Sequence, residues 1–106
     1  MDRTLVKFSS TECGICHKMS FFDEKVSGEL GLRFIDIKLQ DGKTYRQYRN
    51  ILISRYPDKS SMGWPTYFVC DEPEGEFTIL GEIRGGHMKG EFRKRVQAIL
   101  EEVAAG

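Results

Sequence analysis

The stretch Cys13-Gly14-Ile15-Cys16 determines how the rest of this sequence is interpreted. It follows an apolar run at residues 5–8 and opens a segment with helical periodicity. Two thiols separated by two residues can form a disulfide, bind zinc or, because His17 follows, attach a haem. The rest of the sequence is needed to distinguish a disulfide, a zinc site and a haem attachment site.

Composition indicates an ordinary globular protein. We expect the 106 residues to form one domain, residues 1–106, with a single hydrophobic core. Lys+Arg and Asp+Glu number 16 each, so the bulk charge indicates neither nucleic acid nor an anionic membrane as a partner. No signal-peptide region and no run near the roughly 18 apolar residues of a membrane span is found. We therefore expect a cytoplasmic location, where paired cysteines are more often catalytic or metal-binding than structural.

Hydrophobic patterning predicts an alternation of strands and helices. Strands are expected at residues 5–9, 33–39, 66–70 and 77–83. Helical apolar faces are expected at residues 15–30, 45–52 and 88–103, the first ended by the glycines at 28 and 31. The order is therefore β-α-β-α-β-β-α. A right-handed crossover makes the first two strands parallel, and a hairpin adds an antiparallel pair. The predicted fold class is α/β, with a mixed four-stranded sheet flanked by helices.

The two cysteines are expected to have different roles. Cys13 lies at the predicted start of a helix, where unpaired backbone N–H groups and the helix dipole favour the reactive thiolate. Cys13 is therefore expected to be the exposed nucleophile. Cys16, one turn further and more buried, is expected to attack the resulting mixed disulfide and release the reduced product.

Three further features follow the cysteine pair in order. Trp64-Pro65-Thr66 opens the third predicted strand, a predicted hairpin comes next, and Gly85-Gly86 precedes the last helix. With the cysteine motif, these features resemble the thioredoxin-like superfamily over nearly the whole chain. The resemblance implies a thioredoxin-like fold in its small, glutaredoxin-sized form. It also implies a thiol–disulfide oxidoreductase that acts on protein substrates through Cys13 and Cys16.

The resemblance also implies how a substrate is bound. Pro65 would be a cis-proline that faces the disulfide and presents the backbone of Trp64 to an extended substrate. Gly85 and Gly86 would lie beside the substrate groove. Electrons would come from a separate reductase, and we expect no metal, no bound cofactor and a monomer.

Lys7 departs from the superfamily pattern. Thioredoxins place a buried aspartate six residues before the first cysteine, with a lysine on the next strand, whereas this chain has Lys7 at the first position and Asp36 at the second. An unpaired buried lysine is costly, so it should be paired or have a lowered pKa. We predict a charge-swapped pair, Lys7–Asp36, that serves proton transfer at Cys16. The alternative is that Lys7 extends along the surface to water.

The motif also permits other interpretations. Cys13, Cys16 and His17 fit c-type haem attachment, although a cytochrome of this size is expected to be almost entirely helical. A zinc site would need Cys70 or His87 in addition, because the second closely spaced ligand pair is lacking. Cys70 is expected instead to be a small buried hydrophobe. The remaining alternative is a protein-binding module with this fold, in which redox activity is incidental.

Overall fold

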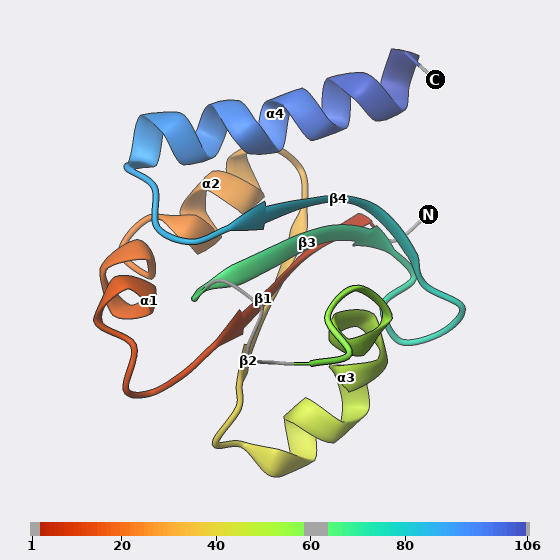
Figure 1. Ribbon diagram of the computed structural model, residues 1–106. Helices are drawn as coiled ribbons and strands as arrows, with labels where there is room; N and C mark the ends of the chain where they lie inside the picture. The colour runs from red at the N-terminus through yellow and green to blue at the C-terminus, as the bar shows by residue number, and fades with distance from the viewer. Residues whose placement is uncertain (1–2, 59–63, 106) are drawn as a thin grey trace.

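A mixed four-stranded sheet forms the centre of the computed structural model, which describes residues 3–58 and 64–105. The strands are β1 (Arg3–Ser9), β2 (Arg33–Lys38), β3 (Thr66–Asp71) and β4 (Thr78–Arg84). Their order across the sheet is β2-β1-β3-β4 (Figure 1). Strand β1 runs parallel to β2, and β3 runs antiparallel to both β1 and β4. This arrangement confirms the predicted fold class.

Helices cover both faces of the sheet. They are α1 (Gly14–Met19), α2 (Asp23–Glu29), α3 (Gly42–Arg55) and α4 (Lys89–Ala105). Figure 1 shows α2 and α4 on one face of the sheet and α3 on the other. The four-stranded sheet excludes the almost entirely helical architecture expected of the haem alternative.

Alternation along the central strands divides the core into two clusters. Leu5 and Tyr67 pack toward α2 and α4, whereas Val6 and Phe68 pack toward α3. Cys70, in the cluster on the α3 side, has no exposed surface, which confirms that it is buried. Because β1 and β3 are antiparallel and buried, the residues that follow β1 and those that precede β3 lie at the same end of the sheet.

The single helix predicted from residue 14, with an apolar face over residues 15–30, is in fact broken. α1 ends at Met19, the Oγ of its C-cap residue Ser20 donates a hydrogen bond to the carbonyl of His17, and α2 begins after Phe22. Phe22 has φ −138°, outside the helical range, and packs against the core cluster on the α4 side. The prediction that Met88 lines the apolar face of the last helix is also wrong. Met88 precedes α4 and is 81% exposed.

Candidate active site

Cys13 and Cys16 form a disulfide at the start of α1, with their Cα atoms 5.2 Å apart. Cys13 is the N-cap residue of this helix, and its Sγ accepts a hydrogen bond from the Cys16 amide at 3.1 Å. Cys13 is half-buried, whereas Cys16 is only 2% exposed. A partner can therefore reach the sulfur of Cys13 more readily than that of Cys16, as the predicted division of roles requires.

The Pro65 loop and the loop before α4 are joined by a hydrogen bond. The Trp64–Pro65 peptide bond is cis, as predicted, and Pro65 is buried. The Pro65 carbonyl accepts a hydrogen bond from the Gly85 amide at 2.8 Å. Gly85 has φ +77°, a left-handed conformation that favours glycine. The two loops predicted to contact a substrate are thus held together by their backbones.

Gly86 lies against a residue of the cysteine motif. A Cβ added at Gly86 would be 2.6 Å from Cγ2 of Ile15, closer than real Cβ contacts come. Ile15 is itself 50% exposed. Gly86 therefore lets the side chain between the two cysteines pack onto the backbone of the loop before α4.

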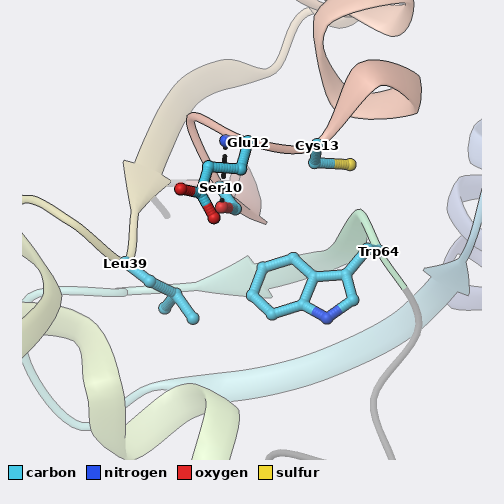
Figure 2. A pocket seen from close by; sticks show the side chains of 5 residues that line it. All are labelled: Ser10, Glu12, Cys13, Leu39 and Trp64. Atoms are coloured by element: carbon cyan, nitrogen blue, oxygen red, sulfur yellow. Dashed lines mark hydrogen bonds between the residues drawn. The ribbon is translucent and has the colours of Figure 1, made fainter.

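A pocket of about 400 Å³ opens beside Cys13. Figure 2 shows its lining residues, with the indole of Trp64 extending toward Leu39 below the cysteine. Trp64 is half-buried and packs against the cluster on the α3 side. The amide of Glu12 donates to Oγ of Ser10 at 3.2 Å on the opposite side of the pocket. The pocket thus presents apolar surface next to the accessible cysteine.

Lys7 is buried and paired, but not with the predicted partner. Its Nζ lies 2.6 Å from Oδ2 of Asp23, the first residue of α2. Asp36 faces Lys7 in the β1–β2 register, yet its carboxylate accepts from Ser9 Oγ at 2.7 Å and from Lys38 Nζ at 3.0 Å. The predicted Lys7–Asp36 pair is therefore wrong. Asp36 is already neutralised by Lys38, and α2 brings Asp23 to the buried ammonium.

Asp23 also binds a tyrosine. Lys7 Nζ donates to the carbonyl oxygen of Cys16 at 3.0 Å as well as to Asp23, and the Tyr67 hydroxyl donates to the same Asp23 oxygen at 2.8 Å. Burial and then the negative charge of Asp23 raise the pKa of Tyr67, which stays a neutral donor. Opposite charges thus compensate each other directly behind the second cysteine.

Sequence reasoning missed Asp23, although a signal for it exists. Met19, Asp23 and Val26 are spaced by four and three residues, which is the spacing of one face of a helix, and all three are buried. A carboxylate within an apolar face needs a buried donor. The pocket residues Ser10 and Leu39 were also missed, because they come from the ends of different strands.

Comparison with solved structures now identifies the fold. A thioredoxin from Thermus thermophilus matches with a TM-score of 0.62 at 22% identity, over 92% of this chain and 73% of that chain. The chain has a thioredoxin-like fold. A thioredoxin pre-protein from Schistosoma mansoni matches at TM-score 0.61 and 15% identity, over 92% of this chain and 79% of that one. Thioredoxin f2 from Chlamydomonas reinhardtii gives TM-score 0.57 and 17% identity, over the same shares of the two chains. No family model and no curated protein sequence matches this chain.

Within this thioredoxin-like fold, the two histidines lie in exposed or half-exposed positions. The ring of His17 contacts the ring of Phe21 edge-on, with 5.3 Å between centroids. A ring nitrogen of His87 lies 3.2 Å from the carbonyl oxygen of Arg84. In the described ranges, 3–58 and 64–105, no three His, Cys, Asp or Glu side chains are grouped so that they could hold a metal ion. Nor does any helix in those ranges combine the length and apolarity needed to cross a membrane.

Proposed function

We propose that this protein is a thiol–disulfide oxidoreductase that acts on protein substrates. The observation that carries the proposal is the Cys13–Cys16 disulfide, which joins a half-buried cysteine at a helix start to a buried one. The thioredoxin-like fold supports the same conclusion. We also propose that the protein is cytoplasmic and monomeric and that it receives its electrons from a separate reductase.

The chemistry consists of two exchange steps. In the reduced protein the Cys13 thiolate attacks one sulfur of a substrate disulfide, and the other substrate sulfur leaves as a thiolate and takes up a proton. The Cys16 thiolate then attacks Sγ of Cys13, the Cys13–Cys16 bond forms, and the second substrate sulfur leaves. The substrate gains two electrons and two protons, and the protein loses them. The Cys16 amide, 3.1 Å from Sγ of Cys13, is placed to stabilise the first thiolate.

The substrate-binding part of the proposal concerns the two joined loops. Trp64 supplies apolar surface in the pocket beside Cys13. Pro65, bound to Gly85, fixes the backbone on which an extended substrate segment would lie. Gly86 has no side chain, so Ile15 packs directly onto the backbone of this loop and its half-exposed side chain would border the same segment.

Insulin reduction with dithiothreitol as the electron source tests this function. The wild-type protein is expected to accelerate insulin precipitation, and Cys13→Ser is expected to abolish the acceleration. Cys70→Ala is the matched control, because it removes a buried cysteine outside the disulfide and should retain activity. Cys16→Ser should accumulate mixed disulfides on Cys13. Wild-type activity at background level, or activity unchanged in Cys13→Ser, would refute the proposal. Partner binding that survives Cys13→Ser without any activity would favour a binding module.

A further inference from the structure

The buried cluster behind the disulfide joins four elements of the fold. Lys7 comes from β1, Cys16 from α1, Asp23 from α2 and Tyr67 from β3. Lys7 and Asp23 are each 1% exposed, and Tyr67 has no exposed surface. Burying two charges is costly, and an apolar pair of similar volume would often be at least as stable. The cost suggests a role in addition to stability.

Lys7 is the charged group that touches the resolving cysteine. Its Nζ lies 3.0 Å from the Cys16 carbonyl oxygen, and that oxygen is only four covalent bonds from Sγ of the same residue. Standard bond lengths therefore keep the ammonium within about 8 Å of the sulfur. The second acceptor of the same ammonium is Asp23, whose Oδ2 lies 2.6 Å from Nζ.

The other groups near the cluster leave this positive charge in place. The Tyr67 hydroxyl is neutral and donates to Asp23. Asp36, on β2, acts on Tyr67 through its charge, but it is paired with Lys38 at 3.0 Å. The titratable groups around Lys7 are thus Asp23, Tyr67 and Asp36, from three neighbouring elements, and Cys16 of α1. The end of the ion pair directed at Cys16 is positive.

We propose that Lys7, held by Asp23 and Tyr67, is a positioning residue that stabilises the Cys16 thiolate in the resolution step. The inference rests on the proposed oxidoreductase function. A thiol as buried as Cys16 resists ionisation because its thiolate loses hydration, and a nearby ammonium offsets that loss. Lys7 acts through its charge and transfers no proton in this step. The proton of Cys16 is taken up, through water, by the substrate sulfur that leaves as the Cys13–Cys16 bond forms.

The two steps can be followed separately with 5,5′-dithiobis(2-nitrobenzoate) and the reduced protein. Attack by Cys13 releases one coloured thiolate, and resolution by Cys16 releases the second. Cys16→Ser, which should release only the first, identifies the two phases. The second phase is then measured against pH in Lys7→Met, Asp23→Asn and the double variant Lys7→Met/Asp23→Asn. Lys94→Met, at an exposed lysine on α4, is the matched control.

Opposite shifts are expected from the two single variants. Lys7→Met leaves the Asp23 carboxylate without its ammonium partner. The midpoint of the pH dependence of the resolution rate should therefore rise by roughly one pH unit, with about tenfold slower resolution near neutrality. Asp23→Asn leaves the Lys7 ammonium without its carboxylate partner, so the same midpoint should fall. The double variant, which lacks both charges, should lie between Lys7→Met and the wild type, and it tests the idea even where Lys7→Met does not fold.

The inference is overturned if Lys7→Met and Asp23→Asn shift the midpoint in the same direction, or if the double variant and Lys94→Met both match the wild type. A wild-type protein with no fast first phase would instead refute the proposed function. The two failures are therefore distinguishable in one set of traces.

Discussion

Removing the Lys7 ammonium is predicted to destabilise the folded protein strongly. Lys7 donates two hydrogen bonds, to the Asp23 carboxylate at 2.6 Å and to the Cys16 carbonyl at 3.0 Å. Hydrogen bonds involving a charged group contribute about 1.5–3 kcal/mol each, which gives a gross loss of about 3–6 kcal/mol in Lys7→Met. Part of this is offset because an ammonium no longer has to be desolvated. The expected net loss is about 3–5 kcal/mol, the range found when one partner of a buried pair is removed.

Urea unfolding of the oxidised protein at neutral pH, followed by circular dichroism, measures this loss. Asp23→Asn should also destabilise, whereas Lys7→Met/Asp23→Asn should lie within about 2 kcal/mol of the wild type, because it leaves no buried charge unpaired. Since Lys7→Met alone should cost about 3–5 kcal/mol and the double variant at most about 2 kcal/mol, the coupling energy from this cycle should be at least about 1 kcal/mol, increased by whatever Asp23→Asn costs. Lys94→Met should change stability by less than about 0.5 kcal/mol. A Lys7→Met loss below about 1 kcal/mol, or a double variant that equals the sum of the single variants, would refute the reasoning.

Three further predictions concern other parts of the site and fold. Gly86→Ala should force Ile15 out of its rotamer at a cost of about 0.5–1.5 kcal/mol, measured by thermal unfolding, and adding Ile15→Ala should remove the penalty. Burial and the hydrogen bond to Glu74 raise the pKa of Tyr48 to about 12. Since its folded value exceeds the unfolded value of about 10, this contribution to stability is complete below pH 10 and is lost as the pH rises toward 12. In Tyr48→Phe, the free energy of unfolding measured with urea should fall less steeply between about pH 10 and pH 12. An unchanged slope would contradict the assignment. Trp64→Ala should lower kcat/KM for a protein disulfide by about tenfold through lost apolar contact, with little effect on hydroxyethyl disulfide; equal losses on both would exclude substrate contact.

The sheet could be predicted because its determinants are local. Residues 5–8 and 66–70 form short, mostly apolar runs suited to strands that are buried on both faces, and the structure has β1 and β3 there. The helical connection from β1 to β2 then makes these two strands parallel neighbours, as the structure has them. The cysteine motif was placed correctly for a similar reason, since Cys13 caps the helix that follows it.

The partner of Lys7 could not be obtained in the same way. The spacing of Asp23 from Met19 and Val26 indicates a buried carboxylate but not which donor faces it, and the break at residues 20–22 carries no proline or glycine to reveal it. The break depends on tertiary packing, because Phe22 leaves the helical conformation and fits against Phe92 of α4. Strand register alone favoured Asp36, but register does not show that Lys38 and Ser9 already hold that carboxylate.

Cys13 supplies one sulfur of the disulfide and is also the N-cap residue of α1. The oxidation state of this cysteine therefore affects the first turn of the helix. A disulfide sulfur is a weak acceptor for the Cys16 amide, whereas a thiolate is a charged and much stronger one. Reduction therefore tightens the first turn of the helix, and by linkage a tighter first turn favours the reduced form. Hydrogen exchange at the single Cys16 amide should slow on reduction, so one backbone proton reports the redox state of the protein without any substrate present.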